Sequence, residues 1–261
     1  MRLVVAQTNP VFGDVVSNVR VAVSLMESER ADLYILPELF NTGYNFIDEG
    51  EVQKLAEPVL GFTFERVAEF AKKRSCYVAY GFAENADRMY NSAALVGPEG
   101  LVGTYRKVHL YYREKLFFAS GNLGFPVFEL PFGNVGVMIC FDWMYPESAR
   151  TLALKGAQLI VHPSNLVLQY CPDAMITRCL ENRVFAATAN RVGRESRGGV
   201  DLIYIGKSEI VSPRGEILAR LGDAETGVAV VDVDLRLAAN KEINEYNDLL
   251  NDRKVQQYSL F

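Results

Sequence analysis

Histidine is the scarcest chemically useful side chain in this sequence, because only His109 and His162 occur among 261 residues. Two histidines exclude a multi-histidine metal site, and they leave any Cys–His nucleophile pair with two candidate bases. The four cysteines lack the close C-x-x-C spacing of metal-binding and redox motifs. They are Cys76, Cys140, Cys171 and Cys179. Cys171, Cys179 and His162 would form a poor ligand set, so we expect no metal.

The sequence also has no long apolar run and no excess of positive charge. Apolar runs end well before the ~18 residues that a membrane span needs, and Met1-Arg2 leads into a strand pattern rather than an export signal. A formal net charge of -5 argues against nucleic acid or an anionic membrane as a partner. Without an export signal, the cysteines are expected to be reduced thiols in a cytoplasmic protein. Glycine-rich phosphate loops and G-x-S-x-G are missing as well.

What is present fits one layered α/β domain. Hydrophobic residues make up 49% of the chain, and segments of helical and strand periodicity alternate along it. Two hairpins are expected, pairing 90–96 with 101–105 and 203–212 with 216–221. No linker or repeat divides the chain, so we predict a single domain over 1–261, with mixed sheets covered by helices. About 236–261 form a polar tail, whose Tyr258, Leu260 and Phe261 are expected to dock on another subunit.

One cysteine stands where a strand meets a helix. Residues 135–139 predict a buried strand, Cys140 closes it, and Pro146 suits the first position of a helix over 146–156. Backbone N–H groups and the positive end of a helix dipole at such a corner favour a thiolate and can hold an oxyanion. The alternative is that Cys140 is one more small buried hydrophobe.

Two charged residues at other strand ends give Cys140 possible partners. Glu38 follows Pro37 at one strand exit, and Lys107 stands at another. Taken alone, Glu38 is a capping acid and Lys107 a solvated lysine. Together the three supply what thiol acylation requires: a base, a cation for the oxyanion, and a nucleophile. Proton equilibria of Glu38 and Lys107 should then be coupled. Glu114 either anchors Lys107 or belongs to a surface charge cluster.

These residues stand in a recognisable order. The segments are Pro37-Glu38-Leu39-Phe40, Tyr105-Arg106-Lys107-Val108-His109 and Ile139-Cys140-Phe141-Asp142, with further matches at 121–125, 162–165 and 178–183. They resemble the nitrilase superfamily, the carbon–nitrogen hydrolases, over essentially the whole chain. The resemblance implies a four-layer αββα subunit, a homodimer, and neither a metal nor an organic cofactor. It also implies a Glu38–Lys107–Cys140 triad, Glu114 as a second acid, and the backbone N–H of Phe141 as an oxyanion donor.

The residues after the cysteine indicate the bond that is cleaved. Phe141-Asp142 looks like the amidase and carbamoylase branches, whereas nitrile-cleaving members usually have Trp-Glu there. Trp143-Met144-Tyr145 occupies the stretch in which branches acting on carboxylate-bearing amides place an arginine. We therefore expect a small aliphatic amide, neutral or amine-bearing, or a carbamoyl amine, cleaved to acid and ammonia through a thioester.

The substrate pocket is expected to be lined by Tyr44, Trp143 and Asn165. The alternatives without a substrate are that Tyr44 is a loop aromatic packed on the core and that Asn165 caps a turn. For the whole chain two other functions stay open: an aliphatic nitrilase using the same triad, and a non-catalytic scaffold that binds a protein partner. A pair of Cys140 with His109 or His162 is the alternative mechanism.

Overall fold

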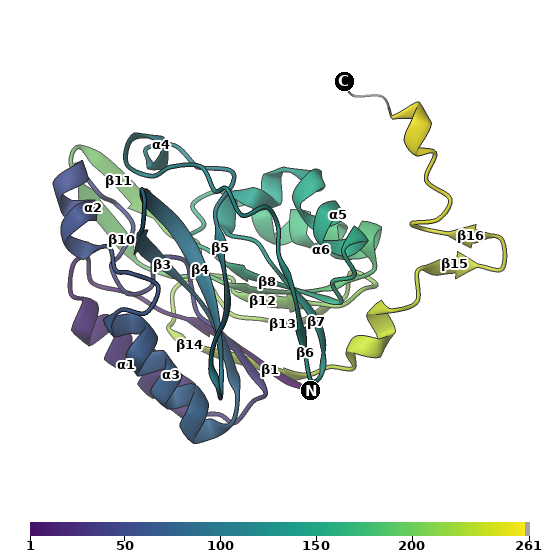
Figure 1. Ribbon diagram of the computed structural model, residues 1–261, viewed down its shortest axis with the longest axis horizontal. Helices are drawn as coiled ribbons and strands as arrows, with labels where there is room; N and C mark the ends of the chain where they lie inside the picture. Colours follow the sequence, from purple (N-terminus) through teal and green to yellow (C-terminus); the bar gives the residue numbers. More distant parts are fainter. Residues whose placement is uncertain (259–261) are drawn as a thin grey trace.

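Two six-stranded sheets form the centre of the computed structural model, which describes residues 1–258 (Figure 1). The first sheet has the order β14-β1-β2-β3-β4-β5. Its strands are β1 Arg2–Gln7, β2 Leu33–Ile35, β3 Tyr77–Asn85, β4 Met89–Gly97, β5 Gly100–Arg106 and β14 Gly227–Asp232. Strands β1, β2 and β3 are parallel, and the hairpin β4–β5 and β14 run antiparallel to their neighbours.

The second sheet repeats this plan with the order β13-β12-β9-β8-β7-β6. Its strands are β6 Val127–Leu130, β7 Gly133–Val137, β8 Leu159–Pro163, β9 Phe185–Ala189, β12 Glu209–Val211 and β13 Ile217–Arg220. Strands β7, β8 and β9 are parallel. Their residues are almost all apolar, as expected of parallel strands that are covered on both faces.

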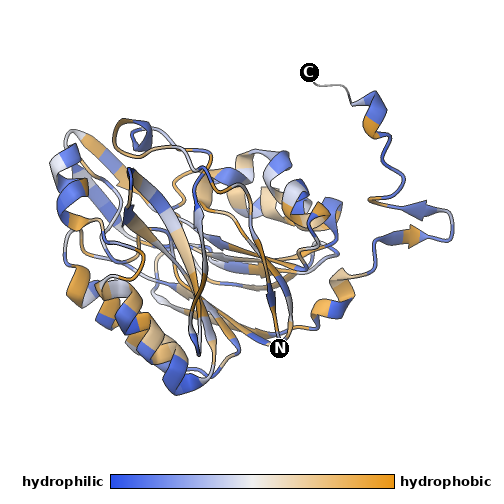
Figure 2. Cartoon of the chain, in the orientation of Figure 1, coloured by the Kyte–Doolittle hydropathy of each residue, from blue (hydrophilic) through white to orange (hydrophobic). Residues whose placement is uncertain are grey.

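Helices cover the outer face of each sheet, so the layers follow the order helix, sheet, sheet, helix. Helices α1 Val15–Glu27 and α3 Phe62–Arg74 pack their apolar side on the first sheet, and α5 Pro146–Leu154 and α6 Cys171–Asn182 cover the second. Figure 2 shows their apolar residues on the inward side and polar residues on the outward side. This is the four-layer α/β fold that the sequence predicted. Pro146 occupies the first turn of α5, as expected.

Parallel central strands bring several loops to one edge of the two sheets. Chain segments leave β2, β5, β7 and β8 at their carboxyl ends, and these segments carry Glu38, Lys107, Cys140 and Asn165 in that order. The carboxyl ends of parallel strands are the usual location of sites in α/β folds. The topology therefore brings the predicted site residues together at one edge of the two sheets.

Several local predictions were wrong. Strand β7 ends at Val137 rather than 139, and the 3-10 helix η1 Cys140–Met144 comes before α5. The expected strand over 203–212 is divided, because β11 Val200–Ile203 pairs with β10 Arg194–Arg197 and only β12 continues the main sheet. Two short helices beside the site, α2 Glu49–Leu55 and α4 Glu114–Phe117, were not predicted.

The C-terminal segment leaves the body of the molecule. After the 3-10 helix η2 Leu235–Ala238 it forms a small hairpin and a last turn that project outward (Figure 1). These elements are β15 Glu242–Asn244, β16 Asn247–Asp248 and η3 Val255–Gln257. Tyr246 at the tip of the hairpin is 82% exposed. Leu260 and Phe261 lie outside the described residues. No helix within 1–258 is long and apolar enough to cross a membrane.

Candidate active site

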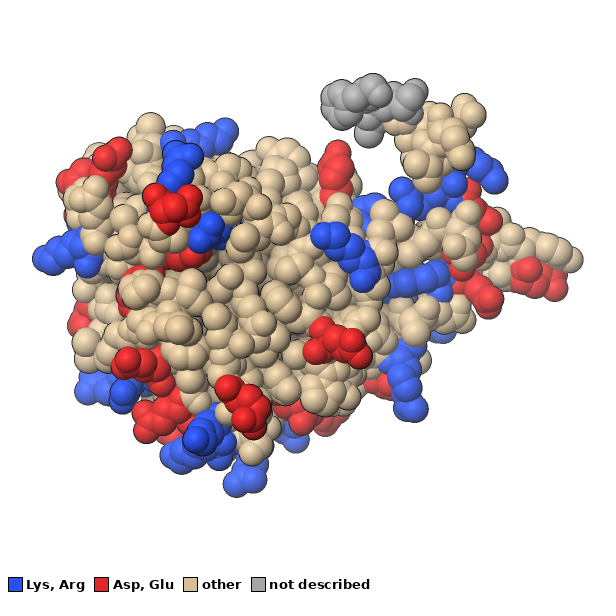
Figure 3. Space-filling view, viewed as in Figure 1, with Lys and Arg blue, Asp and Glu red and all other residues tan. Residues whose placement is uncertain are grey.

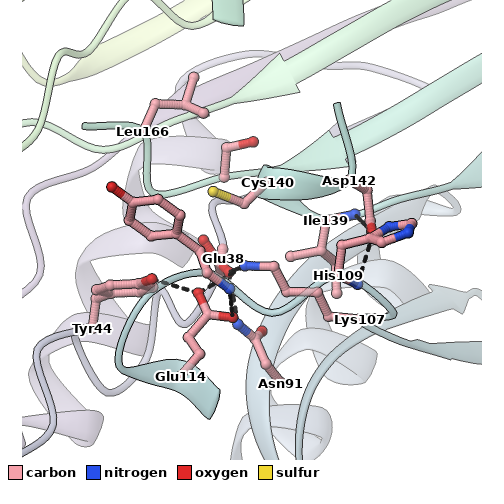
Figure 4. Close-up of polar contacts among 12 residues, drawn as sticks. Glu38, Tyr44, Asn91, Lys107, His109, Glu114, Ile139, Cys140, Asp142 and Leu166 are labelled. Atoms are coloured by element: carbon pink, nitrogen blue, oxygen red, sulfur yellow. Dashed lines mark hydrogen bonds and ion pairs between the residues drawn. The ribbon is translucent and has the colours of Figure 1, made fainter. Parts of the chain in front are cut away.

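Lys107 lies fully buried between two carboxylates (Figure 4). Its Nζ is 2.6 Å from Oε1 of Glu38 and 2.8 Å from Oε1 of Glu114. Burial opposes the charge on the ammonium, but the Glu114 and Glu38 carboxylates outweigh burial and raise the pKa of Lys107. Lys107 is therefore a cation at neutral pH, held by bonds in a place where an unpaired ammonium would be strongly destabilised.

Glu38 uses only one of its oxygens in these contacts. Oε1 accepts hydrogen bonds from Lys107 and from Nδ2 of Asn91, each at 2.6 Å. Oε2 is buried and has no partner among the residues that the structure describes. Buried carboxylate oxygens are normally bonded, so an open one marks a place where another group belongs. Oε2 is thus the atom of Glu38 that is available to exchange a proton.

Glu114, the second carboxylate, is held from two further directions. The hydroxyl of Tyr44 donates to Oε1, and the backbone N–H of Tyr111 donates to Oε2 over 3.3 Å. Burial raises the pKa of Glu114 to about 7, and the nearby Lys107 opposes the rise. Glu114 therefore belongs to the buried cluster and not to a surface group of charges.

A buried ion pair fixes Tyr44 in place. Glu195 accepts the backbone N–H groups of Tyr44 and Asn45, the second at 2.7 Å, and the hydroxyl of Tyr204 at 3.1 Å. Arg191, only 1% exposed, donates to the same carboxylate. The sequence predicts Tyr44 in the wall of a substrate pocket, and in the structure its hydroxyl bonds Glu114 of the charged cluster.

Cys140 occupies a strained position on the turn after β7. Its φ is +41°, in the left-handed region that costs a non-glycine residue about 1–2 kcal/mol. Nε2 of His162 donates to the Cys140 carbonyl over 2.9 Å, and Nδ1 accepts from the Thr188 hydroxyl at 3.0 Å. This pair of bonds helps to hold the turn. Strain of this kind is typical of sites in which a side chain must be aimed.

The thiol of Cys140 lies beside Glu38 and Lys107 in a buried site. Figure 4 shows the sulfur next to the carboxylate of Glu38 and the Lys107 amine. Burial raises the pKa of Cys140 well above its usual range, Glu38 raises it further, and Lys107 lowers it only in part. Desolvation therefore opposes the thiolate that backbone N–H groups at this corner favour.

Asp142 joins the two segments that carry the lysine and the cysteine. Its Oδ2 accepts the N–H of Ile139 at 2.9 Å and the hydroxyl of Tyr105 at 2.7 Å. Its Oδ1 accepts from the backbone and from the Nδ1 of His109, at 3.2 and 2.8 Å. One buried carboxylate thus ties the loop after β5 to the turn after β7.

Two glycines allow backbones to approach closely enough to form the cluster. A Cβ on Gly81 of β3 would lie 2.5 Å from Cα of Glu38. A Cβ on Gly121 would lie 1.9 Å from the carbonyl oxygen of Arg106, and the N–H of Gly121 donates to the carbonyl of Lys107. Any side chain at either position would displace the segment that carries Glu38 or Lys107.

The remaining predicted site residues also lie near the cysteine in sequence or space. The N–H of Phe141 lies in the first turn of η1, where N–H groups have no intrahelical partner. Trp143 is buried within the main core, and its carbonyl accepts from Nε of Arg178 on α6. Asn165 is 3% exposed, and neither atom of its amide has a partner within 1–258. Its backbone N–H favours ionisation of Cys140.

Neither histidine bonds the sulfur in the structure. His109 stacks on Tyr145 with 3.8 Å between ring centroids and bonds Asp142, while His162 bonds the carbonyl of Cys140. These contacts leave the Cys–His mechanism without support. Within the described 1–258, no group of three or more His, Cys, Asp and Glu side chains is placed to hold a metal ion.

Sequence reasoning missed Asn91, Asp142 and His162 as supporting residues. Asn91 carried a usable signal, because it is a carboxamide in the largely apolar β4, where an unpaired amide is destabilising. Asp142 and His162 lie in segments that match the family, but their bonds to Tyr105 and to Thr188 join parts of the chain that are distant in sequence.

Comparison with known proteins places the whole chain in one group. The family model described as carbon-nitrogen hydrolase matches residues 2–241. A protein named nitrilase from Pyrococcus abyssi is 48% identical over 99% of both chains. An N-carbamoylputrescine amidase from Solanum tuberosum is 33% identical over 85% of this chain and 82% of its own. A solved amidase from Nesterenkonia sp. AN1, whose active-site cysteine carries the acetamide moiety of fluoroacetamide, has a TM-score of 0.79. It is 26% identical and covers 98% of this chain and 95% of its own.

Proposed function

The chain belongs to the carbon-nitrogen hydrolase family, and we propose that it is a cysteine-dependent amidohydrolase acting on small aliphatic amides or carbamoyl amines. As a family member with amidase and nitrilase relatives, it is a hydrolase of carbon–nitrogen bonds other than peptide bonds. The observation that carries the proposal is the buried thiol beside a carboxylate with one open oxygen and a paired ammonium.

In the proposed reaction, Cys140 attacks the amide carbon as Oε2 of Glu38 takes the thiol proton. The tetrahedral oxyanion is held by Lys107 and the N–H of Phe141. A donor of this kind is worth roughly 2.7–4 kcal/mol in the transition state. Glu38 returns the proton to the departing nitrogen, and ammonia leaves a thioester on the sulfur.

Water then completes the cycle. Glu38 accepts a proton from the water that attacks the thioester, and the proton passes to the thiol as the acid leaves. Glu114 bonds Lys107 throughout and keeps the amine in position for the oxyanion. For a primary amide, the net change is amide plus water to carboxylic acid plus ammonia, with no co-reactant.

The charges of the cluster favour neutral or cationic substrates. One ammonium stands against two carboxylates, so the cluster has no positive charge to spare for a substrate carboxylate. Arg150 is the first arginine after Cys140 in the sequence and would be the candidate partner for a substrate carboxylate. Its Nη2 instead donates to the carbonyl of Glu181 at 2.7 Å. The buried amide of Asn165 has no partner of its own, so it suits a polar group such as an amide or ureido group.

Small size is the other requirement. Cys140 is only 5% exposed to solvent, so a bulky substrate would not reach the sulfur. The relative named for N-carbamoylputrescine and the Nesterenkonia amidase support carbamoyl amines and small amides as the classes to test.

Ammonia release from a matched panel tests the proposal. Pentanamide, 5-aminopentanamide and the monoamide of glutaric acid share one chain length and differ in charge at the far end. We expect the neutral and cationic amides to be cleaved and the anionic one to be poor. Cys140→Ala should release nothing while keeping its circular dichroism. Ammonia release by Cys140→Ala, or preference for the anionic amide, would overturn the mechanism or the substrate assignment respectively.

Nitrile hydrolysis by the same three residues is the second candidate, and the Pyrococcus abyssi relative named nitrilase favours it. Pentanenitrile added to the panel separates the two. Direct formation of pentanoic acid faster than from pentanamide would assign the chain to nitriles.

We also propose that the chain acts as a cytoplasmic homodimer with its tail on a second subunit, a single catalytic domain spanning 1–261. The projecting tail supports this (Figure 1), since its hairpin carries the exposed side chains of Tyr246 and Ile243. On the face in Figure 3, both signs of charge are interspersed, which fits neither a nucleic acid nor an anionic membrane. Light scattering of the full chain and of a variant ending at 239 tests the assembly: a monomeric full chain contradicts it.

A further inference from the structure

Asn91 occupies a place in the cluster that no catalytic role yet explains. It lies near the start of β4, fully buried, and its Nδ2 donates to Oε1 of Glu38 at 2.6 Å. Its carbonyl oxygen in the main chain accepts the backbone N–H of Lys107 at 2.8 Å. Asn91 thus contacts the base by its side chain and the cation by its backbone.

The bond to Glu38 is selective between the two carboxylate oxygens. Oε1 receives both Asn91 and Lys107, whereas Oε2 receives nothing from the described residues. A carboxylate with two donors on one oxygen cannot rotate without breaking both bonds. The second oxygen is therefore fixed in direction as well as left open.

The bond also favours one charge state. An amide N–H is a donor whatever the pH, so its bond stabilises the ionised carboxylate more than the protonated one. In a buried site, hydrogen bonds to a charged group are roughly twice as strong as neutral ones. Loss of this donor removes that preference and leaves Lys107 as the one remaining donor to Oε1 among the described residues.

We propose that Asn91 is a positioning residue that orients Glu38, so that Oε2 takes the proton of the Cys140 thiol. This inference deepens the proposed function, in which Glu38 is the base. It assigns Asn91 no contact with substrate, so its loss should act on the chemical step and on pH dependence rather than on substrate binding.

A probe that needs no knowledge of the substrate tests the idea. Iodoacetamide alkylates the sulfur: the S–C bond forms, iodide leaves, and the thiol proton passes to Glu38. The rate at Cys140 is followed by mass spectrometry of its peptide as a function of pH. Cys76, Cys171 and Cys179 are fully buried and serve as internal references for unfolding.

Asn91→Leu removes the donor and keeps the branching of the side chain, although leucine is the larger residue. We expect the pH below which alkylation of Cys140 slows, the acid limb of the profile, to rise by about one pH unit or more. This magnitude follows from the strength of a hydrogen bond to a charged group. Asn91→Asp, which keeps the shape but places a second acid beside Glu38, should move the limb in the same direction. If Asn91→Leu does not fold, the pH profile of Asn91→Asp decides whether the inference about Asn91 holds.

Asn182→Leu is the matched control. Asn182 is equally buried, donates one bond, to the carbonyl of Arg178 at 2.9 Å, and has an unpartnered Oδ1 in the described part of the chain, as Asn91 has. It lies at the end of α6, outside the cluster. A merely structural role for Asn91 predicts similar stability losses and unshifted limbs for both variants, and that result overturns the inference.

Ammonia release separates this inference from the proposed function. With the best amide of the panel, Asn91→Leu should lower kcat with little change in KM and move the acid limb of kcat/KM upward. If wild type cleaves no amide, the proposed function fails while the alkylation profiles still decide the role of Asn91. If wild type is active and both profiles of Asn91→Leu match wild type, the inference about Asn91 fails alone.

Discussion

Replacing His162 by Gln should change how the stability of the protein depends on pH. His162 is fully buried, with Nδ1 accepting from Thr188 and Nε2 donating to Cys140, an arrangement that only the neutral ring satisfies. Burial lowers the pKa of His162 to about 4, and the bond to the Cys140 carbonyl opposes this only in part. Its ordinary value is 6.5.

The sign follows from where each state binds the proton. Between about pH 6.5 and about pH 4 the unfolded chain is protonated at His162 while the folded chain is not, so stability falls as the pH falls. The contribution of the neutral His162 ring to the free energy of unfolding is fully present above about pH 6.5 and is lost by about pH 4. At 1.36 kcal/mol per pH unit, the whole window corresponds to about 3 kcal/mol.

Urea unfolding of wild type and His162→Gln at about pH 7.5 and about pH 4.5 measures this. We expect the free energy of unfolding of wild type, relative to the variant, to drop by about 2–3 kcal/mol on acidification. Other titrating groups, such as Glu114 and Glu209, are common to both proteins and cancel in the comparison. His109→Gln removes a partly exposed histidine and serves as the control. A difference that does not vary with pH would refute the reasoning.

The same variant decides the Cys–His alternative. Gln keeps an N–H that is able to donate to the Cys140 carbonyl, so the turn should persist and alkylation of the sulfur should continue. Loss of all reactivity at Cys140 in a folded His162→Gln protein would instead make the ring its base.

Three further substitutions address the supports of the cluster. Gly81→Ala brings a Cβ within 2.5 Å of Cα of Glu38, so kcat should fall by roughly 10²-fold with stability reduced by about 1–3 kcal/mol; an unchanged kcat in ammonia release would contradict it. Asp142→Leu orphans four donors and should cost about 4 kcal/mol or more in thermal unfolding, and a near-neutral effect would refute its linking role. Glu195→Gln should lower kcat through the displaced Tyr44 loop, and full activity with lower thermal stability would reduce Glu195 to a structural role.

Local patterns in the sequence predicted the parts of the site that lie at strand ends. Pro37 before Glu38, the strand before Lys107 and Pro146 after the cysteine each carry their signal within a few residues. The fold follows in the same way, because the apolar runs of β1, β2, β8 and β9 and the amphipathic period of α1 and α3 are local features. The order of helices and strands was therefore predictable before any contact was known.

Other features depend on contacts between distant segments. Asp142 bonds Tyr105 and His109 across more than thirty residues, and no local pattern predicts such a link. The raised pKa of Cys140 has a related origin. Nearby N–H groups were visible in the sequence, whereas the depth of burial that raises its pKa results from the packing of both sheets.

The raised pKa of Cys140 has a consequence for an enzyme at rest. Peroxide and similar oxidants attack thiolates, so a sulfur that keeps its proton in an empty site is a poor target for them. In the proposed reaction, Cys140 gains nucleophilic strength only when a bound molecule presents an electrophilic carbon and Glu38 withdraws the proton in the same event. The Cys140 thiol should therefore stay reduced in air without an added reductant. The three other cysteines are buried and have raised pKa values, so they should stay reduced as well.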